Sequence, residues 1–430
     1  MPRPPLVSIL TLGCKLNRAD SDSIAGNLSR AGFEVTEHLC EAEAFVINTC
    51  SVTHVADQKS RKLIRSARRL SPDAPLAVTG CFPRSAGDAA ATELGANIVV
   101  GTSAGDHLRI VEFLADSRTP ELGDRGRGNP SHSNRLRTRA FIKAQEGCSD
   151  GCAFCIVPRT RGAERSRSLD SVVSDVDGAL SQGALEVVIT GTQLGAWGRD
   201  SAPKEPLAKL MAGLLERTET PRLRLSSLQP QDITPELVGL WEDPRLMPHF
   251  HLSLQSGSDS ILTAMRRRYD TSTFGDAVLR LRAAVPSVAI TTDVIAGFPG
   301  ETNSDFNATI DFSREMEFSR IHVFPYSVRS RTLAAKMSGQ VPAVLKRERV
   351  AELNALGSTL SGSFQNKFTG TVRPVLWEES AKPPFEDQCH GYTDNYIRVR
   401  APGSDLLNRI TPAKLQADGD GEVKGEVMTP

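Results

Sequence analysis

Three cysteines with the spacing C-x3-C-x2-C constrain this chain more than any other feature. Cys148, Cys152 and Cys155 lie in the segment GCSDGCAFCIVPRTRG, directly after a predicted strand over residues 140–145. Three thiolates from one short loop can hold three irons of a cubane cluster and leave the fourth iron open for a substrate. A zinc site or a chance spacing is the alternative, although structural zinc sites draw four ligands and this segment supplies three.

The cysteine segment follows the first of six predicted strands. The strand candidates cover residues 140–145, 185–190, 222–227, 250–255, 288–298 and 320–327. Most of the intervals between them have room for a helix. Parallel strands joined by helices curl into a barrel that keeps its chemistry at the carboxyl ends of the strands. Six units therefore predict a partial (β/α)6 barrel, open on one side, within an α/β protein.

The first part of the chain predicts a separate parallel sheet covered by helices. Buried strands are expected at residues 7–12, 44–48, 76–80 and 97–100, with helical patterns such as residues 57–70 between them. Cys14, Cys50 and Cys81 each follow one of the first three strands. Because the carboxyl ends of parallel strands converge on one edge, we expect these three thiols to meet there. Three unrelated buried cysteines are the alternative, since free cysteine is common in protein cores.

Composition divides the chain into three parts. Residues 117–134 are rich in glycine and proline and poor in apolar residues, which is typical of a linker. The predicted domains are an N-terminal α/β domain over residues 1–116, the barrel over residues 135–366 and a third domain over residues 367–430. In the third domain, short strand-like runs alternate with glycine, proline and aspartate, and this pattern predicts a small β-barrel.

No part of the sequence indicates a membrane or secretory protein. No apolar stretch is long enough to cross a bilayer, and no cleavage site follows the short apolar run near the N-terminus. We therefore expect a cytoplasmic protein without a membrane partner. In that compartment the eight cysteines are expected to be reduced thiols or metal ligands.

The charge of the chain is balanced, with 51 basic and 51 acidic side chains. A surface for nucleic acid must therefore come from local clustering. Basic residues cluster on both sides of the cysteine loop and along the predicted helix at residues 57–70, where a phosphate backbone could meet them; a solvated charged face is the alternative. These residues are Arg135, Arg137, Arg139, Lys143, Arg159, Arg161, Arg165 and Arg167, with Lys59, Arg61, Lys62, Arg65, Arg68 and Arg69 on the helix.

The C-x3-C-x2-C loop after the first strand of a partial barrel resembles the radical-SAM superfamily. That resemblance implies a 4Fe–4S cluster whose open iron is chelated by S-adenosyl-L-methionine (SAM). One electron from the cluster then cleaves SAM to a 5′-deoxyadenosyl radical. The resemblance also implies a reducing electron donor, such as flavodoxin or ferredoxin.

The N-terminal three-cysteine domain in front of such a barrel resembles the methylthiotransferase family. The motifs that carry the resemblance are TLGCKLN (residues 11–17), VINTCSVT (residues 46–53) and VTGC (residues 78–81). The resemblance covers nearly the whole chain. It implies a second 4Fe–4S cluster on Cys14, Cys50 and Cys81, an unknown sulfur donor, a tRNA substrate and a C-terminal TRAM-like RNA-binding domain.

Three branches of this family differ in substrate. One acts on isopentenyl-adenosine in tRNA, one on N6-threonylcarbamoyladenosine in tRNA and one on an aspartate of a ribosomal protein. TLGCKLN, with Lys15 after the cysteine, and the runs HFHLSLQSGSD (residues 249–259) and MRRRYD (residues 265–270) resemble the threonylcarbamoyladenosine branch. The resemblance implies a tRNA (N6-L-threonylcarbamoyladenosine-C2)-methylthiotransferase acting at position 37, in the anticodon loop. The other two branches stay open, as do a radical-SAM enzyme for another substrate and a non-catalytic iron–sulfur RNA-binding protein.

Polar and glycine residues at the ends of the barrel strands are predicted to contact SAM or the substrate. Some follow the second strand, where an ordinary turn is the alternative, and others follow the third to fifth strands. The predicted residues are Thr190, Gly191, Gln193, Ser226, Gln255, Asp293 and Gly297. In the C-terminal domain, Tyr392 and Tyr396 alternate with basic residues and could stack on unpaired bases. Packing of the two tyrosines within the barrel is the alternative.

Overall fold

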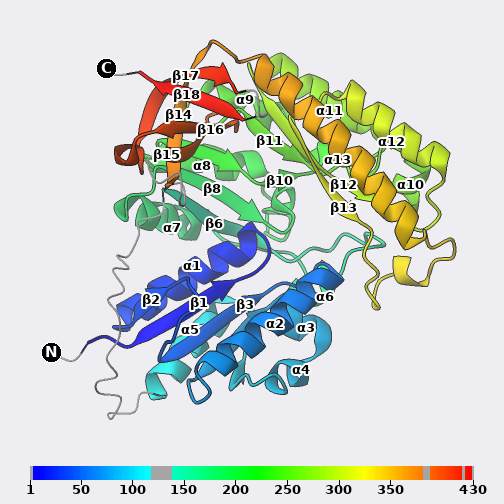
Figure 1. The fold of residues 1–430 in the computed structure, drawn as a ribbon. Helices are drawn as coiled ribbons and strands as arrows, with labels where there is room; N and C mark the ends of the chain where they lie inside the picture. Colours follow the sequence, from blue (N-terminus) through cyan, green and yellow to red (C-terminus); the bar gives the residue numbers. More distant parts are fainter. Residues whose placement is uncertain (1–2, 118–137, 381–387, 419–421, 429–430) are drawn as a thin grey trace.

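The computed structural model describes residues 3–117, 138–380, 388–418 and 422–428. Figure 1 shows three parts: an α/β layer from the first quarter of the chain, a larger curved sheet with outer helices, and a small barrel at the C-terminal end. The predicted fold class is confirmed. The predicted linker, apart from Ser117, lies outside the described residues.

The N-terminal part is a five-stranded parallel sheet with strand order β2-β1-β3-β4-β5. Its three central strands are apolar runs buried on both faces, as expected for a parallel sheet between helices. The strands are β1 (Leu6–Thr11), β2 (Glu34–Thr36), β3 (Ala44–Thr49), β4 (Leu76–Gly80) and β5 (Ile98–Val99). Sequence analysis predicted four of them and missed β2, which has only three residues.

Helices cover both faces of this sheet. On one face, Ile24 of α1 and Ile110 of α5 pack with Val7 and Ile9 of β1. On the other face, helices α2, α3 and α4 pack on Phe45 and Ile47 of β3. The helices are α1 (Lys15–Arg30), α2 (His54–Leu70), α3 (Cys81–Ala86), α4 (Asp88–Thr92) and α5 (Ala104–Asp116).

The central part is the predicted partial barrel. Its main strands run parallel in the order β6-β8-β9, continued by β10-β11-β12-β13, and short β7 pairs antiparallel with the outer edge of β6. β9 and β10 are two pieces of one predicted strand, interrupted at Ser226. The strands are β6 (Arg139–Glu146), β7 (Arg165–Ser166), β8 (Glu186–Gly191), β9 (Arg222–Leu225), β10 (Ser227–Leu228), β11 (His249–Leu252), β12 (Ala289–Ala296) and β13 (Arg320–Pro325).

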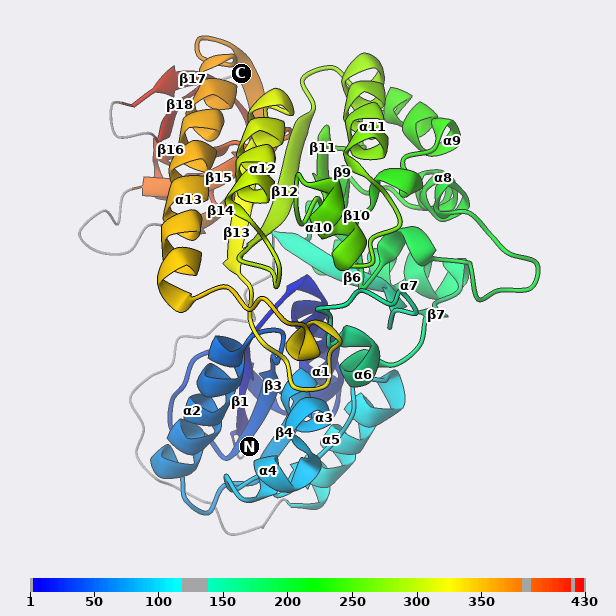
Figure 2. The ribbon, with the colours of Figure 1, turned by 90° about the vertical axis from the view of Figure 1, so that its right-hand side faces the viewer.

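The outer helices of the partial barrel share one continuous apolar core with its strands. Figure 2 shows α11, α12 and α13 side by side along the sheet. The helices are α6 (Val157–Arg161), α7 (Leu169–Ser181), α8 (Leu207–Arg217), α9 (Pro235–Gly239), α10 (Asp259–Ala264), α11 (Thr271–Ala284), α12 (Asn303–Glu315) and α13 (Ala343–Asn366). None of the described helices combines the length and the apolar character that crossing a bilayer requires.

The C-terminal part is a closed barrel with strand order β14-β15-β16-β18-β17. Closure protects the sheet edges, and fully buried Trp377 fills the centre. The strands are β14 (Val372–Ser380), β15 (Gln388–Thr393), β16 (Arg398–Pro402), β17 (Ile410–Ala417) and β18 (Val423–Val427). Sequence analysis predicted the barrel but missed β15 and β17, and Pro412 weakens the strand pattern of β17.

Candidate functional site

The loop that carries Cys148, Cys152 and Cys155 begins directly at the carboxyl end of β6. Gly147 starts it with a φ of +78°, and a Cβ there would come within 1.9 Å of the Ala163 carbonyl oxygen. The Cys148 amide donates to the Gly162 carbonyl at 3.0 Å, so the two ends of the loop are joined. This closure requires glycine at position 147 and presents three half-buried thiols from one short segment.

The environment of these thiols opposes ionisation in the absence of a metal. Burial is the main cause that raises the pKa of Cys148 to about 11 and that of Cys155 to about 12, and negative charge on neighbouring Cys152 contributes to both shifts. Arg267 opposes this effect, because its Nη1 donates to the Cys152 sulfur at 3.2 Å. Bound iron would supply the positive charge that three thiolates need, so this donor set suits a cluster.

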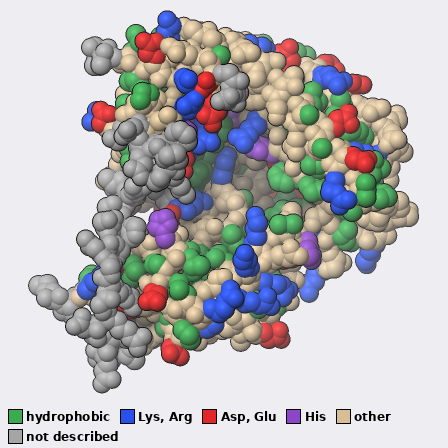
Figure 3. Space-filling model, viewed as in Figure 1, with side chains coloured by type: hydrophobic (Ala, Val, Ile, Leu, Met, Phe, Trp, Pro, Cys, Tyr) green, Lys and Arg blue, Asp and Glu red, His purple; other side chains and the backbone are tan. Residues whose placement is uncertain are grey.

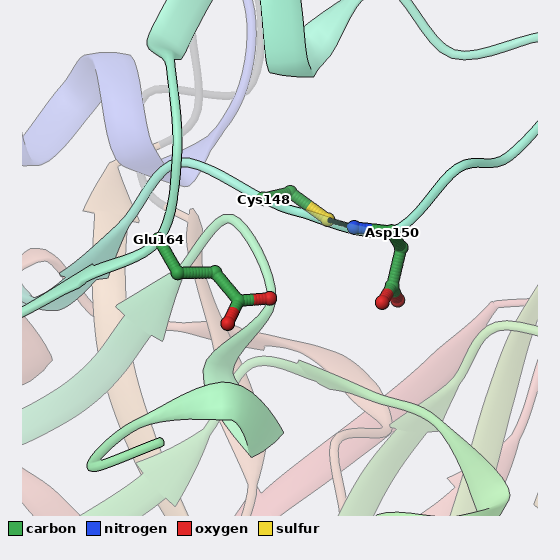
Figure 4. A group of neighbouring side chains, drawn as sticks. All are labelled: Cys148, Asp150 and Glu164. Carbon is green, nitrogen blue, oxygen red and sulfur yellow. Dashed lines mark hydrogen bonds between the residues drawn. The ribbon is translucent and has the colours of Figure 1, made fainter. Parts of the chain in front are cut away.

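A smaller group with mixed ligands shares one of these cysteines. The Cys148 sulfur and carboxylate oxygens of Asp150 and Glu164 all lie within 4.8 Å of one another (Figure 4). Asp150 is already engaged, however, because Gln229 donates to it at 3.0 Å and Arg268 forms an ion pair with it. The group also supplies three ligands where a structural zinc site takes four, so it does not strengthen the zinc alternative.

Cys14, Cys50 and Cys81 lie together at one edge of the N-terminal sheet. They follow β1, β3 and β4, which are neighbours in the sheet. A Cβ on Gly13 would lie 3.1 Å from the Cys50 sulfur, so the segment before Cys14 runs directly past Cys50. Burial raises the pKa of Cys50 to about 11, and thiolates on Cys81 and Cys14 would raise it further. The structure thus brings these three thiols together, and they too could be held as thiolates by iron.

Arg161 connects the two cysteine groups. It ends α6, just beyond the first cysteine loop, and its side chain is 2% exposed. Its guanidinium donates to Asn17 at 2.6 Å and to Asp20 at 2.9 Å on α1, and to Glu146 at 2.8 Å on β6. Burial raises the pKa of the Cys81 thiol, and adjacent Arg161 opposes this rise. One arginine therefore touches the barrel strand, helix α1 and the second cysteine group.

Arg329 makes a second connection between the partial barrel and the N-terminal part. It lies in the segment between β13 and α13, which Figure 2 shows crossing to the N-terminal part. Its guanidinium donates to Asp57 at 2.7 Å, to Ser51 at 2.8 Å and to Ser85 at 2.9 Å. Ser51 is the residue after Cys50, so this contact fixes the backbone beside a cysteine of the second group. Sequence analysis gave neither Arg161 nor Arg329 this role, because their partners are far away in the chain.

The residues predicted after the second strand lie in a tightly bonded turn. Thr190 and Gly191 end β8, and Thr190 is buried. The Gln193 amide donates to the Gln145 side chain at 2.9 Å, and the Gln193 side chain donates to Asp232 at 3.3 Å. The Gln193 side chain is therefore already used within the protein.

The other predicted contacts divide into two groups. Gln255 has a φ of +70° and its amide donates to the Asp293 carbonyl at 2.8 Å, so these two residues lie side by side. Ser226 is buried at the break between β9 and β10, and its hydroxyl has no partner among the described residues. Gly297 faces helix α13, since a Cβ there would lie 2.2 Å from Cγ of Lys346.

The predicted basic patch is divided by burial. Arg139, Lys143 and Arg161 are engaged in buried or half-buried ion pairs, such as the one between Lys143 and Asp20, so the structure corrects the expectation that they form a surface. Arg135 and Arg137 lie outside the described residues. On α2, in contrast, most basic side chains are exposed: Lys59, Lys62, Arg65 and Arg69. Figure 3 shows basic side chains both on this lower part and around a central hollow between the parts.

The two tyrosines of the C-terminal barrel pack inside the protein. Their rings stack at a centroid distance of 4.8 Å, His249 stacks on Tyr396 at 4.3 Å, and the Arg139 guanidinium lies over both tyrosine rings. Arg224 also lies over Tyr396. These contacts occupy the rings and favour the packing alternative over stacking on RNA bases.

Two family models match the chain. The one described as "Uncharacterized protein family UPF0004" matches residues 6–101, and the one described as "Radical SAM superfamily" matches residues 142–313. The first includes Cys14, Cys50 and Cys81, and the second includes the loop of Cys148, Cys152 and Cys155. The radical-SAM match implies a 4Fe–4S cluster and SAM.

Curated relatives match over almost their whole length. The threonylcarbamoyladenosine tRNA methylthiotransferase MtaB of Bacillus subtilis is 36% identical, with 96% of this chain and 94% of the relative covered. MtaB of Thermotoga maritima is 34% identical, with 93% and 92% covered. The tRNA-2-methylthio-N(6)-dimethylallyladenosine synthase of Rickettsia conorii is 31% identical, with 98% and 99% covered.

A solved structure shares the fold at low sequence identity. It is the radical S-adenosylmethionine methyltransferase TsrM from Kitasatospora setae with cobalamin and a [4Fe-4S] cluster bound. The TM-score is 0.57 at 16% identity, with 77% of this chain and 74% of that chain covered. This likeness concerns the fold alone.

Proposed function

Since the chain belongs to the family of radical-SAM tRNA methylthiotransferases, we propose that it transfers a methylthio group to C2 of N6-threonylcarbamoyladenosine at position 37 of tRNA, next to the anticodon. The observation that carries the proposal is the contact made by Arg161, which follows the loop of Cys148, Cys152 and Cys155 on α6 and touches Asp20 on α1 and the Cys81 thiol. The choice of substrate rests on the MtaB relatives, at 34–36% identity. Relatives named for dimethylallyladenosine, at 31–32%, make that nucleoside the one to test against.

The proposed chemistry explains why iron–sulfur cofactors are needed. The C2–H bond of adenine is strong and non-acidic, so a general base cannot activate it. When bound, a cluster with SAM on Cys148, Cys152 and Cys155 and a second cluster on Cys14, Cys50 and Cys81 would supply radical chemistry and the transferred sulfur. The proposal includes a low-potential electron donor, such as flavodoxin or ferredoxin, and a separate sulfur donor.

The protein's own part in this reaction is placement. Arg161 and Arg329 act as positioning residues. Arg161 binds both α1 and β6, and Arg329, which lies between β13 and α13, binds Asp57 and Ser51 of the N-terminal part. Reaction geometry is sensitive to displacements of about 1 Å, so contacts that fix the two cysteine groups relative to each other should affect the rate. Arg267 would balance part of the charge of Cys152.

The proposed tRNA partner fits the distribution of charge. The exposed basic face of α2 lies on the N-terminal part, and further basic side chains surround the central hollow (Figure 3). We propose that this face binds the phosphate backbone, while the target base leaves its stack and enters between the two cysteine groups. The C-terminal barrel is proposed as a further RNA-binding surface through its outer side.

The test compares two cysteine variants. Anaerobically purified protein should contain about eight irons per chain, and both Cys50→Ala and Cys152→Ala should lower this to about four. Cys152→Ala should lose reductive SAM cleavage. Cys50→Ala should keep cleavage but make no methylthiolated nucleoside. Cys40→Ala is the matched control, because Cys40 belongs to neither group, and it should keep both clusters.

Mass spectrometry of nucleosides decides the substrate. Wild-type protein should convert tRNA carrying threonylcarbamoyladenosine and leave tRNA carrying dimethylallyladenosine unchanged. Conversion of the dimethylallyl substrate alone would reassign the protein to the other branch. Methylthiolated tRNA from the Cys50→Ala variant would overturn the two-cluster assignment.

A further inference from the structure

Lys15 is an unusual residue in its position. It is the first residue of α1, directly after Cys14, and the first turn of this helix contains no acidic side chain. A helix N-terminus carries partial positive charge, so a lysine there is unfavourable and an anion is favoured. Among the described residues, the half-buried Lys15 ammonium makes no hydrogen bond or ion pair. Local stability therefore does not explain this lysine.

The Lys15 side chain extends toward the interior of the partial barrel. The charged groups that act on it come from β6, β9, β12 and the C-terminal barrel: Arg139, Arg224, Asp293 and Tyr396. Burial lowers the pKa of Lys15 most, and the two arginines lower it as well, whereas Tyr396 and Asp293 raise it. Among the described residues, Lys15 thus has neighbours of both signs but no direct ion pair.

The nearby carboxylates are already occupied. Asp293 pairs with His251, whose Nε2 lies 3.2 Å from the Asp293 carboxylate, and the His322 ring packs 5.8 Å from the His251 ring. Glu186 forms ion pairs with Arg139 at 2.8 Å and with Arg224 at 2.9 Å. Glu378 also forms an ion pair with Arg139. These carboxylates therefore have partners of their own, whereas the Lys15 ammonium has no direct partner among the described residues and is available to a ligand.

We infer that Lys15 is a specificity-determining residue that binds the carboxylate of the threonyl group on the substrate base. The inference rests on the proposed function. The threonylcarbamoyl substituent carries a carboxylate, whereas the dimethylallyl substituent is uncharged and apolar. An unpaired, half-buried cation favours the first and rejects the second, because an apolar group would desolvate it without providing a partner. Lys15 also acts on the half-buried imidazole of His322, which suits the hydroxyl and urea groups of the substituent.

The methionine end of SAM also carries a carboxylate. Lys15 adjoins Cys14 of the second cysteine group, whereas SAM is expected at the loop of Cys148, Cys152 and Cys155. We therefore assign Lys15 to the carboxylate of the substrate base, which must lie between the two groups, and a SAM-binding measurement distinguishes the two sources.

The experiment uses the full-length holoenzyme and three anticodon stem-loop RNAs. These carry threonylcarbamoyladenosine, its methyl ester or dimethylallyladenosine, and their affinities are measured by fluorescence anisotropy. Lys15→Met should weaken binding of the threonylcarbamoyl RNA by about tenfold to a hundredfold, the usual worth of a hydrogen bond to a charged group. The methyl-ester RNA should bind wild type and Lys15→Met equally. Lys15→Arg, which keeps the charge, should recover part of the lost affinity.

Three results separate the possible failures. Equal binding of the threonylcarbamoyl RNA and its methyl ester by wild type would overturn the inference, even if wild type makes the proposed product. A loss of SAM affinity in Lys15→Met, measured without RNA, would assign the lysine to the SAM carboxylate and would also overturn it. Conversion of dimethylallyladenosine alone by wild type would refute the proposed function itself. Circular dichroism of each variant checks that the chain is folded.

Discussion

Arg161 is predicted to hold helix α1 against the partial barrel. Its guanidinium forms ion pairs with Asp20 on α1 and Glu146 on β6, and the side chains of Arg161 and Asp20 are 2% and 1% exposed. Burial alone would raise the pKa of Asp20, but Lys143 and Arg161 together hold it below its ordinary value. Arg161→Met removes one of these cations and leaves both carboxylates buried.

The size of the effect follows from what remains after the substitution. Removing one partner of a buried ion pair costs about 3–5 kcal/mol, because the other charge stays desolvated. Lys143 still lies 2.5 Å from Asp20 and 3.3 Å from Glu146, so compensation is partial. We therefore expect the lower end of this range, about 3 kcal/mol, which corresponds to roughly a hundredfold change in a local opening equilibrium.

Hydrogen exchange of backbone amides measures this opening directly. In Arg161→Met, amides of α1 (Lys15–Arg30) should exchange roughly a hundredfold faster than in wild type, and those of α11 (Thr271–Ala284) should not change. Arg159→Met is the matched control, because Arg159 lies on the same short helix with its side chain exposed. It should leave exchange in α1 at the wild-type rate.

Two outcomes would refute this reasoning. Wild-type exchange of α1 in Arg161→Met would mean that the buried ion pairs do not hold the junction. Equal acceleration in α1 and α11 would mean that the substitution destabilises the whole chain and has no local effect. Arg161→Lys should give an intermediate result, because lysine keeps the charge but cannot donate to Asn17, Asp20 and Glu146 in the same planar geometry.

Two further predictions concern the C-terminal barrel and its contact with the partial barrel. Burial alone would raise the pKa of Glu186, but Arg139 and Arg224 lower it to about 2. Ionised Glu186 therefore stabilises the fold fully above its ordinary pKa of 4.5, and this contribution is lost as the pH falls through about 2. Glu186→Gln should lower the free energy of urea unfolding by about 3 kcal/mol at pH 7, and the difference from wild type should shrink below pH 4.5. A difference that is independent of pH would contradict a stabilising role for ionised Glu186. Trp377 is fully buried and donates to Thr411 at 2.8 Å, so Trp377→Ala should destabilise the C-terminal barrel by about 3–5 kcal/mol. In the alanine variant, limited proteolysis should then cut this barrel and spare the N-terminal sheet. Trp377→Phe should resist cleavage better than Trp377→Ala. Equal resistance of the alanine variant and wild type would show that the indole does not stabilise the barrel.

The sequence alone was enough to predict the architecture where local patterns are strong. Buried runs such as Leu76–Gly80 consist almost wholly of apolar or small residues, and the alternation of such runs with helical segments predicts parallel sheets. The positions of the cysteines relative to these strands predicted that Cys14, Cys50 and Cys81 would meet, because strand order and direction place strand ends at one edge. Short strands such as Glu34–Thr36 were missed because three residues carry no recognisable period.

The tertiary structure decided which charged side chains are buried in ion pairs and which face solvent. Buried Arg139 and exposed Arg65 cannot be told apart from the sequence, since a basic residue in a cluster looks the same whether its partner is solvent or a distant carboxylate. Arg161 donates to Asp20, which is 141 residues away in the sequence, and Arg329 donates to Asp57, which is 272 residues away. Ion pairs depend on distance and burial in space, which no local pattern records. For the same reason, only the folded chain distinguishes Lys15, which lies beside a cysteine of the second group and makes no direct ion pair among the described residues.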